Sequence, residues 1–361
     1  QEGQRLAATV KLPEAPAQDA RAPLPPAADR LLVCNKAAHT LSIFSPAERR
    51  ELAVLPTGRG PHEVAVSPDG RVAVVSDYGD RQPGHTLTVV DVVRAAVLRT
   101  IDLARPDGDG GGDRDAKYLR PHGVRFVAAR RVAVTSETAR RLLLVDVEPA
   151  ADRPAVVRWW PTPQRSMHMV ATTADRGRAF ATSIADGDVA VFDLTATTGT
   201  ATPAPIPTGA GAEGLAVHPT TGHAWVGNRA ADTLSVVDGG RGEVVATLAT
   251  GRFPFRVAFT PDGRFALVTC AESGELQVFD AATRELARDV SLHGDRSEQG
   301  AVPLGVVSDP DGRFAYVACG RGEFVAVVDI AAGAVVDRFD AGAGPDGIAY
   351  ARPEGDAGVR R

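Results

Sequence analysis

A repeat of about 42 residues runs through most of this chain, and it restricts the possible folds more than any other feature of the sequence. Each unit begins with a turn and an apolar strand, passes through a hairpin such as Ser67-Pro68-Asp69-Gly70, and returns as a second apolar strand. Units of this size cannot bury their apolar faces alone, so neighbouring copies must stack. The repeat therefore predicts an array of small antiparallel sheets.

The number of units and their arrangement at the chain ends define the architecture. Six complete units can be aligned by their first strands, which begin at Pro61, Pro121, Met167, Ala212, Pro254 and Pro303. A seventh unit is divided between the ends, because residues 30–55 supply three strands and residues 345–350 supply the missing first strand. A shared unit closes a ring and leaves no sheet edge open. The sequence thus predicts an all-β fold, a seven-bladed β-propeller of four-stranded blades closed by a C-terminal strand that joins the N-terminal blade.

The predicted domain organisation follows from these boundaries. Residues 1–28 are rich in proline and alanine and are expected to form an extended tether. The propeller is expected over residues 29–352, and residues 353–361 form a tail.

The repeats around residues 65–70 and 258–269, and third strands such as residues 233–238, resemble the YVTN family of β-propeller repeats. The resemblance covers roughly residues 30–350 and implies the propeller fold. It says little about activity, since the family includes cell-surface proteins, exported scaffolds and propeller domains of redox enzymes. No catalytic motif is carried over from it residue by residue.

Composition narrows the possible partners and location. The formal net charge is -5, the pI is near 5.9, and no basic cluster is present, so no nucleic-acid partner is expected. No apolar run approaches the roughly eighteen residues that a membrane span requires. The start at Gln1 and the tether that follows suit an exported protein, so a secreted or periplasmic location is expected. The cysteines Cys34, Cys270 and Cys319 lie at strand ends and are expected to be buried free thiols.

Corresponding residues at the start of each first strand should form a ring around the central channel of a propeller. In chain order this ring is His62, His122, His168, Glu213, Phe255, Leu304 and Asp346. Neutral imidazoles and carboxylates are good ligands for iron(II), copper or zinc. The sequence therefore predicts one transition-metal ion held by His62, His122, His168 and Glu213. A polar channel without metal is the alternative reading of the same residues.

Other residues near the predicted ring receive supporting roles. Glu213 and Asp346 are the candidates for acid or base catalysis. Asp77, Glu137 and Asn228 end second strands near the ring and are candidates for orienting its imidazoles, although acids at such positions also cap turns. A small-molecule substrate would contact the apolar ring members and nearby cations. These are Phe255, Leu304, Lys36, Arg165, Arg229, Arg252, Arg256 and Arg321.

Both methionines of the chain, Met167 and Met169, flank His168, an arrangement that would suit copper. Strand alternation, however, directs the neighbours of an inward residue away from the channel. We therefore expect the two methionines to pack within the blades.

Two classes of function remain open at this point. The first is a metal-dependent enzyme that acts on a small molecule, with an oxidoreductase or oxygenase favoured over a lyase or hydrolase. The second is a non-catalytic exported propeller that binds a protein or a glycan on its rigid face. The sequence contains no nucleophile-elbow, phosphate-loop or Cys-x-x-Cys motif that would favour another chemistry.

Overall fold

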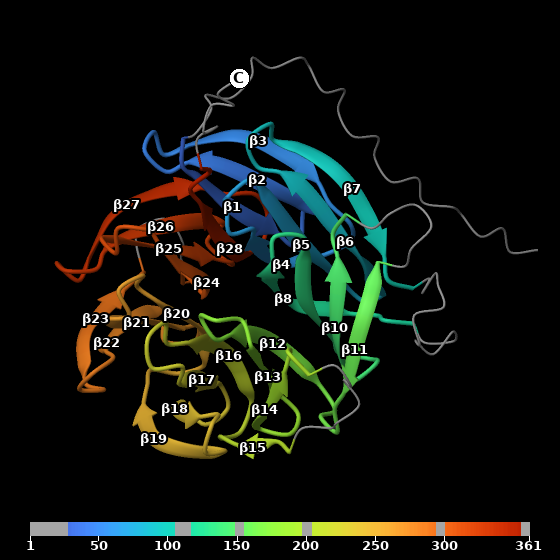
Figure 1. Cartoon of the computed structure of the whole chain (residues 1–361). Helices are drawn as coiled ribbons and strands as arrows, with labels where there is room; N and C mark the ends of the chain where they lie inside the picture. The colour runs from blue at the N-terminus through green and yellow to red at the C-terminus, as the bar shows by residue number, and fades with distance from the viewer. Residues whose placement is uncertain (1–27, 105–116, 149–154, 197–203, 294–299, 355–361) are drawn as a thin grey trace, which may run out of the picture.

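The seven repeats fold into seven four-stranded antiparallel sheets arranged in a ring (Figure 1). The computed structural model describes residues 28–104, 117–148, 155–196, 204–293 and 300–354. The predicted tether, apart from Ala28, and the part of the predicted tail beyond Glu354 lie outside these ranges. The predicted seven-bladed propeller is confirmed.

Each blade contains four strands, which we call innermost, second, third and outermost in order from the channel, while the β labels follow the order of the chain. The innermost strands are β28 (Pro345–Ala351), β4 (Pro61–Val66), β8 (Pro121–Ala128), β12 (Met167–Thr172), β16 (Ala212–Val217), β20 (Pro254–Phe259) and β24 (Pro303–Ser308). The second strands are β1 (Arg30–Asn35), β5 (Val72–Gly79), β9 (Arg131–Ser136), β13 (Arg178–Ser183), β17 (Ala224–Asn228), β21 (Phe265–Cys270) and β25 (Phe314–Cys319). The third strands are β2 (Thr40–Ser45), β6 (Pro83–Asp91), β10 (Arg141–Asp146), β14 (Asp188–Asp193), β18 (Thr233–Asp238), β22 (Glu275–Asp280) and β26 (Phe324–Asp329). The outermost strands are β3 (Arg50–Pro56), β7 (Ala96–Asp102), β11 (Val156–Pro161), β15 (Ile206–Pro207), β19 (Glu243–Ala249), β23 (Leu286–Ser291) and β27 (Ala334–Asp340).

The ring is closed by β28, which pairs antiparallel with β1, so that Leu32 lies opposite Ala349. Just beyond this pairing, the guanidinium of Arg352 contacts the carboxylates of Asp29 at 2.8 Å and Asp311 at 3.1 Å. The two ends of the described chain are therefore joined by backbone pairing and by ion pairs.

The apolar core lies between the facing sheets of neighbouring blades. In one of these layers, Val74 and Leu87 of one blade pack with Val134 and Leu143 of the next. Neighbouring blades cover both faces of the second and third strands. These strands are therefore nearly continuous apolar runs in the sequence. Cys34, Cys270 and Cys319 are buried free thiols, as predicted.

A β-bulge interrupts every innermost strand at the ring position. In β4, for example, the register shifts between Pro61 and Glu63, and in β20 it shifts between Pro254 and Arg256. A bulge places two residues opposite one and re-aims their side chains. Two successive residues of a strand can therefore border the channel.

Both methionines pack within the blades, as predicted: Met167 lies in one core layer and Met169 packs against another. Met169 also lines the channel, which strand alternation did not predict. The bulge accounts for this because the inserted residue breaks the period of two.

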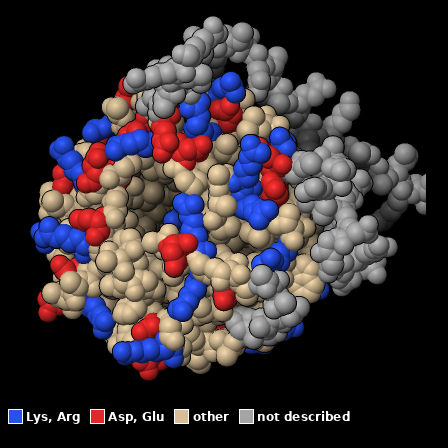
Figure 2. Space-filling model, viewed as in Figure 1, with Lys and Arg blue, Asp and Glu red and all other residues tan. Residues whose placement is uncertain are grey.

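The face of the disc seen in Figure 2 carries basic and acidic side chains that are interspersed. No helix in the part of the chain that the structure describes is long and apolar enough to cross a membrane.

Candidate functional site

The three predicted histidines meet near one end of the channel, which we call the upper mouth and define by the first residues of the innermost strands. The ring centroids of His62 and His122 are 4.2 Å apart, and those of His122 and His168 are 3.4 Å apart. His62 and His168 are more distant, with centroids 6.2 Å apart. All three side chains are buried.

The donor atoms that lie close enough to share an ion belong to a different set from the one predicted. Among the described residues, a single group of three potential ligands, His62, Glu63 and Asp346, has its donor atoms within 4.8 Å of one another. His62 is common to this group and to the predicted set. Glu63 was missed by sequence reasoning, because strand alternation predicts that a neighbour of His62 points away.

Within this cluster, Nδ1 of His62 lies 3.1 Å from Oδ2 of Asp346 and 3.7 Å from Oε1 of Glu63. Nδ1 of His62 has no hydrogen bond within the described ranges, because its approach to Oδ2 of Asp346 lacks hydrogen-bond geometry. Oδ1, the other carboxylate oxygen of Asp346, also has no hydrogen-bond partner among these residues. Lys36 Nζ lies 3.4 Å from Oδ2 of Asp346. The cluster therefore contains a buried ring nitrogen and a buried carboxylate oxygen that form no hydrogen bond with its side chains.

His122 is the most unusual member of the ring. Its side chain is 0% exposed, and neither of its ring nitrogens has a hydrogen-bond partner among the residues that the structure describes. Buried polar atoms are almost always paired, so such an atom calls for an explanation such as a bound ion. His122 lies against His62, but it does not belong to the group of donor atoms that could share an ion.

Glu213, the predicted carboxylate ligand, is committed to other partners. Its Oε1 accepts hydrogen bonds from Nε2 of His168 at 3.2 Å and from Nη1 of Arg256 at 3.0 Å. Its Oε2 accepts one from Arg229. Burial alone would raise the pKa of Glu213, but His168, Arg256 and Arg229 hold that pKa well below its usual range. Glu213 is therefore an anion that anchors three neighbours.

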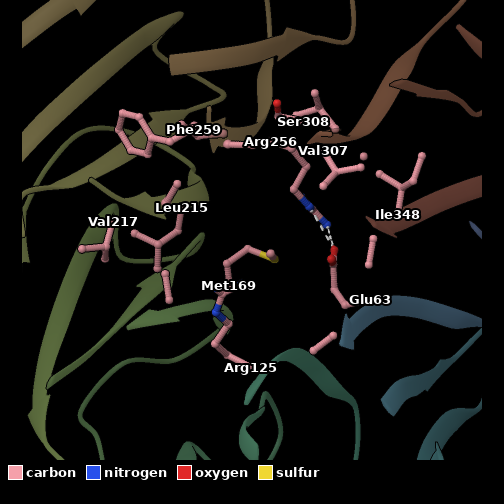
Figure 3. A pocket seen from close by; sticks show the side chains of 18 of the residues that line it. Glu63, Arg125, Met169, Leu215, Val217, Arg256, Phe259, Val307, Ser308 and Ile348 are labelled. Atoms are coloured by element: carbon pink, nitrogen blue, oxygen red, sulfur yellow. Dashed lines mark hydrogen bonds and ion pairs between the residues drawn. The ribbon is translucent and has the colours of Figure 1, made fainter. Parts of the chain in front are cut away.

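Arg256 of β20 links two carboxylates across the channel. Its Nε donates to Oε1 of Glu63 at 2.9 Å (Figure 3). Its Nη1 donates to Oε1 of Glu213 at 3.0 Å. Burial opposes the charged guanidinium, but Glu63, Glu213 and Asp346 raise the pKa of Arg256. Arg256 was predicted to contact substrate, and the structure places it between acidic side chains inside the channel.

Charges and protonation states decide what the site offers to a ligand. Burial, followed by the nearby Lys36 and Arg256, lowers the pKa of His62 well below its ordinary value, so its imidazole is neutral at pH 7. The pKa values of Glu63 and Asp346 are raised, chiefly by burial. A neutral imidazole has a free lone pair, which metal binding requires.

Two of the predicted supporting residues make contacts inside their own blades. Oδ2 of Asp77 accepts hydrogen bonds from Thr86 at 2.7 Å and from Thr88 at 2.9 Å. The amide of Asn228 donates to Thr233 and to Ser235 in the same way. These contacts tie the second strand of a blade to its third strand.

The third predicted supporting residue, Glu137, reaches the histidines through Tyr78. The Tyr78 hydroxyl donates to Glu137 at 2.7 Å. The Tyr78 ring lies edge-on to His62 and His122, with centroids 5.3 and 5.2 Å apart. Sequence reasoning missed Tyr78, although it directly follows the singled-out Asp77.

Part of the predicted substrate pocket is brought together at the upper mouth. A cavity of about 520 Å³ is lined there by Asp346, Lys36, Phe255, Leu304 and Arg321, among others. Cavities of this volume suit small organic molecules. Asp346 thus belongs both to the candidate metal cluster and to the wall of this cavity.

The remaining predicted cations lie elsewhere. Arg252 lines a neighbouring cavity of about 390 Å³ together with Leu304 and Arg321. Arg165 is exposed and pairs with Asp186 at 2.6 Å.

A second cavity, of about 420 Å³, occupies the channel below the Glu63–Arg256 pair. Figure 3 looks into this cavity and shows Met169 reaching into it, with Arg125 nearby. It extends to the opposite end of the channel, which we call the lower mouth. The buried cluster therefore separates an upper cavity from a lower one, and sequence reasoning did not anticipate the lower one.

Comparison with known proteins identifies the fold alone. No protein-family model and no curated protein matches this chain. Among solved structures, it is similar to a hydrazine synthase from Kuenenia stuttgartiensis, with a TM-score of 0.63 and 15% identity over 80% of this chain and 88% of that one. It is also similar to a protein of unknown function from Desulfotomaculum acetoxidans, with a TM-score of 0.68 and 14% identity over 90% of this chain and 99% of that one. Likeness at this level of identity supports the propeller fold and nothing finer.

Proposed function

We propose that this protein is a metal-dependent enzyme whose ion is held by His62, Glu63 and Asp346 at the upper mouth of the propeller channel. The observation that carries the proposal is the convergence of these three donor groups within 4.8 Å. Two of their donor atoms, Nδ1 of His62 and Oδ1 of Asp346, lack partners among the described residues. Buried polar atoms in this condition are costly unless something else binds them.

The ligand chemistry restricts the identity of the ion. One imidazole and two carboxylates form a harder donor set than the three imidazoles expected from the sequence. Cysteine does not belong to the cluster, and the thioether of Met169 borders the lower cavity instead. Iron(II) and zinc suit this set better than copper.

The reaction class follows from the open side of the cluster. Three protein ligands leave positions on an iron or zinc ion for substrate or water. The adjoining cavity of about 520 Å³ gives a small molecule access to Asp346. We propose oxidoreductase chemistry with iron(II) as the first activity to test, and lyase or hydrolase chemistry with zinc as the second.

A second function is favoured by the charge balance of the channel. The three buried carboxylates Glu63, Glu213 and Asp346 face three cations, Arg256, Arg229 and Lys36. The polar cluster is therefore electrically neutral without an ion when its histidines are neutral. This balance suits a rigid propeller that binds a protein or a glycan and uses the cluster to hold its blades together.

Elemental analysis of protein purified without a metal-binding tag tests the proposal. We expect about one equivalent of iron or zinc in the wild type and its loss in His62→Ala, because one of the three ligands is removed. His85→Ala is the matched control, since this exposed histidine pairs with Asp102 on the surface. Metal that persists in His62→Ala, or a wild type that binds neither added iron(II) nor added zinc, would favour the binding scaffold.

A further inference from the structure

The lower channel is lined by apolar side chains from all seven innermost strands, such as Val64, Val124, Leu215, Val257 and Ile348. Met169 adds a flexible, polarisable thioether to this wall. The apolar side chains share the wall with polar groups, so the wall is mixed in character. A cavity of a few hundred Å³ with such a wall has room for a small organic molecule that carries both an apolar and a polar part.

At the end of this cavity nearest the cluster, the charged groups of Glu63 and Arg256 are already paired with each other. Glu63 is the only acidic residue among the described residues that line it, and its carboxylate accepts hydrogen bonds from Arg256. Arg256 also donates to Glu213 and to the carbonyl oxygen of Phe255. These groups do not offer a free charge to a ligand, so this end of the cavity does not require a charged one.

Arg125 of β8 differs from the other buried or channel-facing arginines. It lines the lower channel and also a cavity of about 320 Å³ at the lower mouth. Its side chain is exposed to the channel, and within the described ranges it has no hydrogen bond or ion pair to an acidic side chain. Arg176 lines the same cavity at the mouth, so two cations face one opening.

The acidic side chains near the lower mouth are occupied in their own turns. Asp309 accepts hydrogen bonds from the backbone N–H groups of Arg313 and Phe314, and Asp262 accepts from Thr260 and from the N–H of Arg264. None of the described acids lines the cavity at the mouth. An anionic group from outside the protein is therefore the natural partner of Arg125.

We propose that the lower channel binds a small organic carboxylate, with its anionic group on Arg125 and its apolar body directed toward Glu63. The further claim that this carboxylate is a substrate rests on the proposed function, because Glu63 belongs to the candidate metal cluster. The binding itself does not depend on a metal. The proposal adds a second route to the cluster, from the lower mouth on the side of Glu63, to the route through the upper cavity on the side of Asp346.

Hexanoate is a suitable probe of intermediate length. Arg125 is three residues after the ring position of β8, and Glu63 is one residue after the ring position of β4. Their backbone positions are therefore offset along the strand direction by two residues, or about 7 Å. An extended chain of about six carbon atoms has a similar length.

Calorimetric titration of metal-free protein in the presence of EDTA tests the proposal. We expect hexanoate to bind at one site, and both acetate and 1-hexanol to bind at least about tenfold more weakly, since each lacks one of the two matching parts. Arg125→Gln should weaken hexanoate binding by about tenfold or more, and Arg125→Lys should retain part of the affinity. Arg252→Gln, the same change beside the upper cavity, should bind hexanoate as the wild type does.

Several results would overturn the proposal. These are equal affinities for hexanoate and 1-hexanol, no loss of hexanoate binding in Arg125→Gln, or no hexanoate binding at all. Melting curves of Arg125→Gln and Arg125→Lys would establish that both variants are folded. Metal content separates this test from the proposed function: Arg125→Gln should keep its metal, whereas His62→Ala should lose its metal and still bind hexanoate.

Discussion

Asp77 carries the sharpest prediction about stability, because its carboxylate is 0% exposed and lacks a cationic partner among the described residues. Burial raises its pKa from 3.8 to about 7, although the hydroxyls of Thr86 and Thr88 and the backbone N–H of Gly58 oppose the shift. The equivalent positions of two other blades contain Asn35 and Asn228, each of which donates to two hydroxyls of its own third strand. Asp77→Asn should therefore be accepted by the blade.

The sign and size of the effect follow from linkage. Between pH 3.8 and about 7, folded Asp77 holds a proton that the unfolded chain has released, so wild-type stability falls as pH rises through this window. Each pKa unit corresponds to about 1.4 kcal/mol, so ionising Asp77 in the folded protein costs about 4 kcal/mol at pH 8. The neutral amide avoids this cost. We expect Asp77→Asn to be more stable than the wild type by about 2–4 kcal/mol at pH 8 and by about 1 kcal/mol at pH 4.5.

Urea unfolding of both proteins at the two pH values measures this difference. Other titrating groups are common to the two proteins and cancel in the comparison. Asp80→Asn, an exposed change in the same blade, is the control and should show no such pH-dependent gain. A gain of equal size at both pH values, or a loss at pH 8, would refute the argument that Asp77 is destabilised by its buried charge.

Two further predictions concern the channel. Arg256→Met leaves the buried carboxylate of Glu63 without its cationic partner and should lower the free energy of unfolding by about 3–5 kcal/mol in urea titrations. Adding Glu63→Gln should restore part of this loss. Arg165→Met, at an exposed ion pair, should change stability little, and an unchanged Arg256→Met midpoint would contradict the assigned role. His122→Leu in the presence of EDTA should leave stability unchanged or raise it by about 1 kcal/mol, because two unpartnered buried nitrogens are removed. His168→Leu, which breaks a bond to Glu213, should destabilise under the same conditions, and equal losses in both variants would show that His122 has partners.

The sequence by itself determined the architecture and the membership of the ring. Strand-hairpin-strand repeats set the number of blades, and the division of one repeat between residues 30–55 and 345–350 set the closure. Alignment of the repeats placed His62, His122 and His168 in equivalent positions, and the structure brings their rings together. These features were predictable because a strand repeat fixes the position of each residue within its own blade.

Only the tertiary structure decided which side chains share a site. The bulge in β4 brings Glu63 to the channel beside His62, against the alternation that a regular strand would impose. Arg256 meets Glu63 from 193 residues away, and no local pattern records a contact across the axis. Asp77 was predicted to orient the histidines, but in the structure its carboxylate accepts a hydrogen bond from Thr86 of its own blade. The repeat determines which residue each blade places at the ring position. The distances across the channel and the pairing of buried charges depend instead on how all seven blades pack together.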